Sequence, residues 1–125
     1  MGRLVHFELH ADDPERAVAF YTSVFGWTVN RMGDMEYWLL TTGPDDEPGI
    51  NGAILPRQGG RPDVGAPIVG MVNTVQVDDL DATLAKALEL GAQMALDKMA
   101  IPGVGTVAYL IDTENNVVGV LQPEG

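Results

Sequence analysis

The two histidines of the chain, His6 and His10, lie in the alternating stretch LVHFELH (residues 4–10), with Glu8 between them. Residues i, i+2 and i+4 of a strand share one face and follow one another at about 6.5–7 Å. Imidazole and carboxylate groups so arranged can bind a metal ion, act as an acid–base pair, or form the polar face of an ordinary strand. His6 and Glu8 are therefore candidate catalytic residues, and all three are candidate ligand-binding residues.

The composition limits the classes of function. A chain of 125 residues fits one domain with a substantial core, and the absence of cysteine excludes disulfides and thiolate metal sites. The net charge of −11 argues against nucleic-acid binding and favours cationic ligands. No apolar run approaches the roughly 20 residues of a membrane span, and no signal segment opens the sequence, so we expect a cytoplasmic protein without membrane contact.

The first half of the sequence predicts a strand, a helix and three further extended segments. Residues 4–11 alternate as a strand, and Asp12 or Asp13 can then cap a helix that has Pro14 in its first turn and ends at Gly26. Extended segments are predicted at residues 27–32, 36–42 and 49–56. Residues 57–67, RQGGRPDVGAP, lack periodicity and indicate a linker or loop.

The second half repeats the first. Residues 71–92 again predict a strand, an Asp-Asp cap and a helix with a terminal glycine, and Asp78 and Asp79 lie 66 residues after Asp12 and Asp13. Extended segments follow at about 93–96, 106–112 and 117–122. The sequence thus predicts an α+β fold of two tandem βαβββ modules, about 1–57 and 69–125, joined by a linker of about 58–68 within one domain. Each helix should cover one sheet face, and the opposite faces should form a cleft.

The repeat and its motifs resemble the vicinal oxygen chelate superfamily, which includes glyoxalases, extradiol dioxygenases, and bleomycin- and fosfomycin-resistance proteins. The opening RLVHFELHADDPERAVAFYTSVFGW is similar to the family's first strand and helix, and VDDLDATLAKALELGA to its second helix. The closing IPGVGTVAYLIDTENNVVGVLQP resembles the last hairpin, although Thr113 and Asn115 replace the usual Pro and Gly of its turn. The resemblance covers nearly the whole chain and implies the glyoxalase/bleomycin-resistance/dioxygenase fold.

The resemblance also implies where a metal would bind. Metal-dependent members take His or Glu ligands from the first and last strand of each module, and His6 occupies the first of these positions. The repeat offset places the others at about Ala53, Val72 and Gly119, which offer no ligand atoms in their side chains. Because a catalytic metal needs about three protein ligands, no cofactor is expected and a divalent metal is disfavoured.

Further ligand-binding candidates follow from the repeat and from composition. Thr74 and Gln76 are the second-module counterparts of Glu8 and His10. Alternation puts Tyr37 and Trp38 on opposite faces, and we expect Trp38 to lie in the cleft or at its rim. Tyr109 and Arg57 complete the set, the latter for an anionic ligand. The glycine- and proline-containing stretch 101–105 is either a lid or a plain strand connection.

Three functions remain open at this stage. The first is a metal-independent small-molecule binder that sequesters a drug or toxic metabolite, with a cationic or aromatic ligand. The alternative is a metal-dependent lyase, isomerase or dioxygenase with a non-standard ligand set around His6. The third is a non-catalytic partner domain. The resemblance further implies a homodimer.

Overall fold

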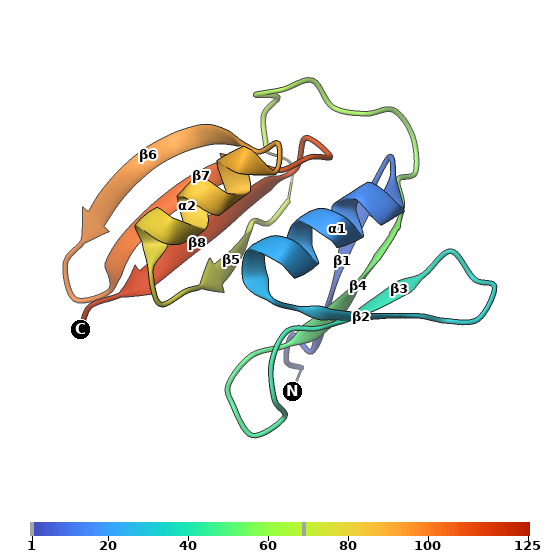
Figure 1. Ribbon diagram of the computed structural model, residues 1–125, viewed down its shortest axis with the longest axis horizontal. Helices are drawn as coiled ribbons and strands as arrows, with labels where there is room; N and C mark the ends of the chain where they lie inside the picture. The colour runs from blue at the N-terminus through green and yellow to red at the C-terminus, as the bar shows by residue number, and fades with distance from the viewer. Residues whose placement is uncertain (1, 69) are drawn as a thin grey trace. The chain divides into compact units, whose positions relative to one another are not determined.

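The computed structural model describes residues 2–68 and 70–125, which form two compact units that divide between Arg61 and Pro62 (Figure 1). The division between the units falls inside the segment predicted as a linker, while residue 69, where the second module was predicted to begin, lies outside the described residues. Among the described helices, none is long and apolar enough to cross a membrane.

Unit 1 is a four-stranded sheet with one helix against it. Its elements are β1 (His6–Ala11), α1 (Pro14–Phe25), β2 (Thr28–Arg31), β3 (Trp38–Thr41) and β4 (Asn51–Pro56). The strand order is β1-β4-β3-β2, with β1 parallel to β4 and the other neighbours antiparallel. This is the predicted βαβββ order.

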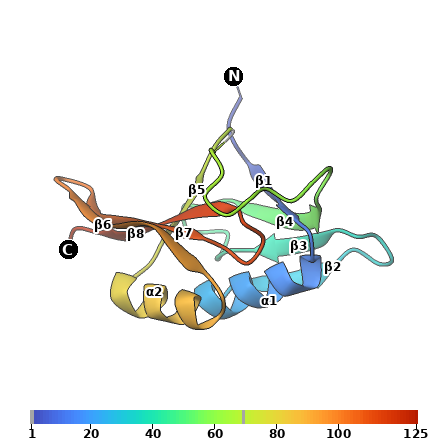
Figure 2. The same cartoon turned by 90° about the horizontal axis from the view of Figure 1, so that it is seen from above.

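Local chemistry sets both ends of α1. The Asp13 side chain accepts a hydrogen bond from the backbone N–H of Arg16 at 3.1 Å, and Pro14 opens the first turn. At the other end Gly26 adopts φ +73° and donates to the carbonyl of Thr22. Between them Ala17, Phe20 and Tyr21 are buried, so α1 covers one face of its sheet (Figure 2).

Unit 2 repeats the arrangement. It contains β5 (Asn73–Gln76), α2 (Leu80–Glu89), β6 (Gln93–Ile101), β7 (Gly105–Ile111) and β8 (Val117–Pro123), in the sheet order β5-β8-β7-β6. Asp79 caps α2 as Asp13 caps α1, and Leu80, Leu84 and Ala87 form its buried stripe. Strand β6 is longer than the predicted 93–96, because it continues as an antiparallel hairpin with β7 through two register shifts. Two βαβββ modules are therefore confirmed.

The turn between β7 and β8 is built around Asp112. Its Oδ1 accepts hydrogen bonds from the backbone N–H groups of Glu114 at 2.8 Å and Asn116 at 2.9 Å. Asn115 adopts φ +61°, a left-handed conformation that asparagine tolerates better than most residues. Asn115 thus adopts the left-handed backbone conformation that glycine favours.

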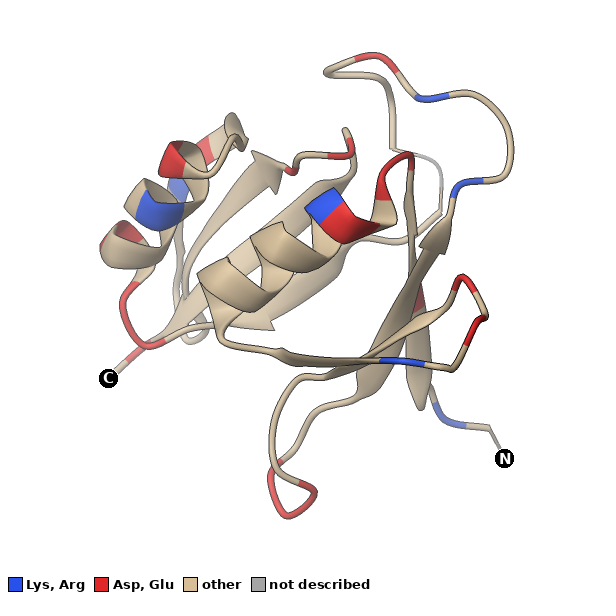
Figure 3. Ribbon diagram, turned by 45° about the vertical axis from the view of Figure 1, so that its right-hand side comes forward, with Lys and Arg blue, Asp and Glu red and all other residues tan. Residues whose placement is uncertain are grey.

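Acidic residues gather at the element ends. Asp and Glu residues occupy the turns that precede both helices and the loop between β3 and β4 (Figure 3). The capping aspartates explain part of this excess, because an anion at a helix N-terminus is stabilised by the helix dipole.

Candidate functional site

Three polar side chains of unit 1 form a continuous hydrogen-bonded chain on the sheet. The Tyr37 hydroxyl donates to Oε2 of Glu8 at 2.7 Å and lies 2.8 Å from Nε2 of His6. The His6 and Tyr37 ring planes are nearly parallel, at 13°. One phenol oxygen therefore bridges an imidazole and a carboxylate that sit two residues apart on β1. We call His6, Tyr37 and Glu8 the polar triad.

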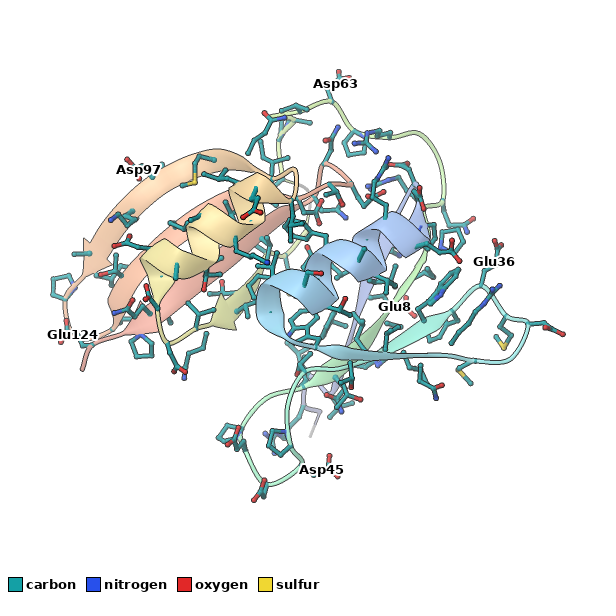
Figure 4. The ribbon with its side chains drawn as sticks, viewed as in Figure 1. Glu8, Glu36, Asp45, Asp63, Asp97 and Glu124 are labelled. Atoms are coloured by element: carbon teal, nitrogen blue, oxygen red, sulfur yellow. The ribbon has the colours of Figure 1, made fainter. Side chains whose placement is uncertain are left out.

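Strand register places the polar triad on the sheet face away from α1. Phe7 and Leu9 point toward α1, and the alternation leaves His6 and Glu8 on the other face, where both are exposed. Glu8 pairs with Ala53 on β4, and Ala53 pairs with Leu39 on β3. Tyr37 precedes Leu39 by two residues and so shares its face, and the small Ala53 side chain leaves room between them. Figure 4 labels Glu8 on β1.

The polar triad also fixes the protonation of its central member. The hydrogen bond to Glu8 raises the pKa of the Tyr37 hydroxyl, with further contributions from partial burial and from the charge of Glu8. Tyr37 therefore keeps its proton at neutral pH and acts as a hydrogen-bond donor. It was not among the predicted site residues.

Trp38 lies on a different face of the sheet from the one predicted. It pairs with Ile54, which pairs with Leu9, and these three residues share the α1-facing side of the sheet. Trp38 is only 9% exposed, and the guanidinium of Arg31 lies 4.7 Å from its ring centroid. The expected alternation of Tyr37 and Trp38 holds, but Tyr37 occupies the face of Glu8 and Trp38 the packed face.

Arg57 lies in an ion-paired cluster at the end of β1. Its Nε is 3.2 Å from Oδ1 of Asp12, whose Oδ2 is 2.9 Å from Nη1 of Arg61. The backbone N–H of Arg57 also donates to the carbonyl of Ala11. These contacts bind the start of the segment after β4 to the β1–α1 turn, and a role of Arg57 toward an anionic ligand stays a prediction. His10, on the same strand, is half-buried.

In unit 2 the equivalent face carries Thr74, Gln76 and Tyr109. Thr74 pairs with Gly119, and Gly119 pairs with Tyr109. A Cβ atom placed on Gly119 would lie 2.7 Å from Oγ1 of Thr74 and 3.2 Å from the Tyr109 ring. The absence of a side chain at Gly119 thus lets Thr74 and Tyr109 approach each other. Gln76 is exposed two residues along β5 from Thr74.

The stretch 101–105 forms the turn between β6 and β7. The backbone N–H of Gly103 donates to Oε2 of Glu124 at 2.9 Å, and the N–H of Glu124 donates to the carbonyl of Val104 at 3.1 Å. This stretch was predicted to be either a lid or a plain strand connection. The contacts describe a strand connection, a hairpin turn that is hydrogen bonded to the C-terminal segment.

The residues at the family's metal-ligand positions do not fit a metal ion. Glu8 pairs with Ala53 and Thr74 with Gly119, so both modules have the same register, and neither Ala53 nor Gly119 offers a ligand atom in its side chain. His6 Nε2 and Glu8 Oε2 are already hydrogen bonded to Tyr37. Across residues 2–68 and 70–125, no three His, Asp or Glu side chains gather as a metal-binding group.

Comparison with known sequences gives a family match and a longer relative. Residues 3–43 match the family model described as bleomycin resistance protein-like N-terminal. The chain is 36% identical over 129 residues to a Mycobacterium bovis protein named "Putative glyoxylase CFP32", covering 98% of this chain and 44% of that protein. The chain therefore spans less than half the length of this curated relative.

Solved structures share the fold at low sequence identity. A glyoxalase/bleomycin resistance protein/dioxygenase family enzyme from Burkholderia phytofirmans has a TM-score of 0.73 and 17% identity, covering 95% of this chain and 97% of its own. TnmS3, an antibiotic binding protein from Streptomyces, has a TM-score of 0.68 and 20% identity, covering 99% and 98%. With the tandem βαβββ modules, these similarities show that the chain has the fold of glyoxalase, bleomycin-resistance and dioxygenase proteins, and that its first module is similar to the bleomycin-resistance-like family.

Proposed function

We propose that the protein is a metal-independent binder of small molecules, which sequesters a drug or toxic metabolite. The observation that carries the proposal is the polar triad, an exposed set of hydrogen-bonding groups whose bonds to one another take the place of bonds to a metal. The antibiotic-binding TnmS3 supports this function by analogy of fold. The chain's net charge of −11 favours a ligand with a cationic group.

Calorimetric titration tests this function directly. We expect at least one member of a panel of bleomycin-type and other cationic natural products to bind, with an affinity that a chelator leaves unchanged. Glu8→Gln should weaken that binding about tenfold, or about 1.4 kcal/mol, because it removes a charged hydrogen-bonding partner. Glu36→Gln is the matched control, since Glu36 is exposed in the same unit and lies outside the polar triad.

Comparing the two variants separates the effect of a direct contact with the ligand from the effect of the protein's overall charge on affinity. If Glu36→Gln weakens binding as much as Glu8→Gln, the loss of affinity comes from the overall charge of the protein, and the proposed contact with Glu8 is wrong. No heat and no change in tryptophan fluorescence across the panel would contradict the binding function itself.

A metal-dependent lyase, isomerase or dioxygenase is the second candidate, and the glyoxylase name of the 36% identical relative is the observation in its favour. Elemental analysis of protein purified without a histidine tag distinguishes the two candidates. Stoichiometric zinc, nickel, manganese or iron would support the enzyme and contradict metal-independent binding.

We also propose a homodimer, in which exposed apolar residues before the edge strands β1 and β5 take part in contacts between the two chains. Val5 and Met71, 66 residues apart, precede these strands at equivalent positions and are 74% and 81% exposed. Light scattering at micromolar concentration should give the dimer mass, and the double variant V5D/M71D should give the monomer mass. V64D, at another exposed apolar residue, should stay dimeric. A monomeric wild type would contradict the proposal.

A further inference from the structure

The polar triad has a definite direction of proton donation. A carboxylate at neutral pH only accepts hydrogen bonds, so the contact with Glu8 requires the Tyr37 hydroxyl to donate its single proton there. The phenol oxygen then has only lone pairs to offer to His6. The 2.8 Å contact between this oxygen and Nε2 of His6 is a hydrogen bond only if Nε2 carries a proton.

We infer that Glu8, acting through Tyr37, fixes the neutral His6 side chain as its Nε2–H tautomer and leaves Nδ1 as a hydrogen-bond acceptor. Tyr37 is the positioning residue in this arrangement, because it connects the carboxylate to the imidazole. A hydrogen bond at one ring nitrogen of a histidine determines which nitrogen carries the proton. Here Nε2 is bonded to the Tyr37 hydroxyl, whose proton already points to Glu8.

The direction of these hydrogen bonds indicates the chemical class of ligand, and this step rests on the binding function proposed above. The His6 ring and the Glu8 carboxylate are exposed on one strand face. Each has a further acceptor atom, Nδ1 of His6 and the second carboxylate oxygen of Glu8. Two acceptors in this arrangement favour a ligand group with several N–H donors, such as an amidinium, a guanidinium or a primary ammonium. A carboxylate or phosphate group would face only acceptors and a negative charge.

NMR of the imidazole nitrogens tests the predicted tautomer of His6 without any ligand. Protonated and bare ring nitrogens differ widely in ¹⁵N shift, so one long-range ¹H–¹⁵N spectrum at alkaline pH reads the tautomer of each histidine. The chain has two histidines, so His10 is an internal reference. We expect wild-type His6 to be predominantly Nε2–H.

Two variants make the test decisive. Tyr37→Phe removes the bridge and reports the intrinsic preference of the exposed ring. Glu8→Ala keeps the bridge but removes its acceptor, which frees the hydroxyl to donate to Nε2 and should move His6 toward Nδ1–H beyond the level in Tyr37→Phe. An Nδ1–H wild type, or a Glu8→Ala protein with the same tautomer ratio as Tyr37→Phe, would overturn the inference. Unchanged His10 signals show that each variant is folded.

The ligand class is tested with benzamidinium and benzoate, two probes of similar shape and opposite charge. Benzamidinium should shift the His6 ring signals at an affinity at least about tenfold above that of benzoate, and Glu8→Ala should remove the difference. Equal binding of the two probes, or preference for benzoate, would contradict the ligand class. The tautomer measurement needs no ligand, so its failure is distinguishable from failure of the proposed binding function.

Discussion

Replacing Gly52 by alanine is expected to lower the free energy of unfolding of unit 1 by about 3 kcal/mol. A Cβ at this position on β4 would overlap the backbone carbonyl oxygen of Phe7 and lie 2.6 Å from two atoms of its ring. The carbonyl belongs to the paired strand β1 and cannot move without shifting the β1–β4 register. The substitution should therefore also displace His6 and Glu8.

Gly43→Ala is the matched control for this substitution. A Cβ atom placed on Gly43 would meet only open space, and its φ is not positive, so its replacement should change stability by less than about 0.5 kcal/mol. Both tryptophans, Trp27 and Trp38, lie in unit 1, so denaturant titration followed by tryptophan fluorescence reports this unit. If the Gly52→Ala and Gly43→Ala proteins unfold at the same denaturant concentration, the close approach to Phe7 is not a packing constraint.

Tyr21→Ala should cost more, about 3–5 kcal/mol of unfolding free energy. Tyr21 is 1% exposed, and its ring centroid lies 5.2 Å from that of Phe20, 5.8 Å from that of Phe25 and 5.4 Å from that of Trp27. Removing the ring leaves a large cavity among aromatic groups of α1 and of Trp27, which follows the helix. The same fluorescence titration measures the loss.

Tyr21→Phe provides the comparison, because it retains every ring contact of the aromatic cluster. It should lose less than half of the stability lost by Tyr21→Ala. Equal losses in the two variants would show that the hydroxyl, and not the packing of the ring, accounts for the contribution of Tyr21.

Much of the fold could be predicted from the sequence because its determinants are local. The Asp13 and Asp79 caps mark where the helices begin, and both cap as predicted from the Asp-Asp pairs. The 66-residue repeat then gives the module order, and the pairing of Glu8 with Ala53 and of Thr74 with Gly119 follows the same offset. The strand β6 was predicted too short because its apolar and polar residues do not alternate regularly.

The polar triad could not be predicted, because it depends on register between strands that are distant in sequence. Alternation shows that Tyr37 and Trp38 point to opposite faces, but it does not say which face belongs to Glu8. That assignment requires the pairing of Leu39 with Ala53 and of Ala53 with Glu8. The aromatic character of Trp38 favoured a residue that lies on the packed face, whereas Tyr37 has a hydroxyl within reach of two polar side chains.

Gly119 limits how this scaffold could be redesigned. A single substitution to glutamate, which would introduce a carboxylate ligand, places its first side-chain carbon against Thr74 and Tyr109. Engineering a metal centre into unit 2 must therefore begin with smaller residues at positions 74 and 109 and add the ligand afterwards. The order of changes matters because the space that a ligand side chain would need is part of the packing between β5, β8 and β7.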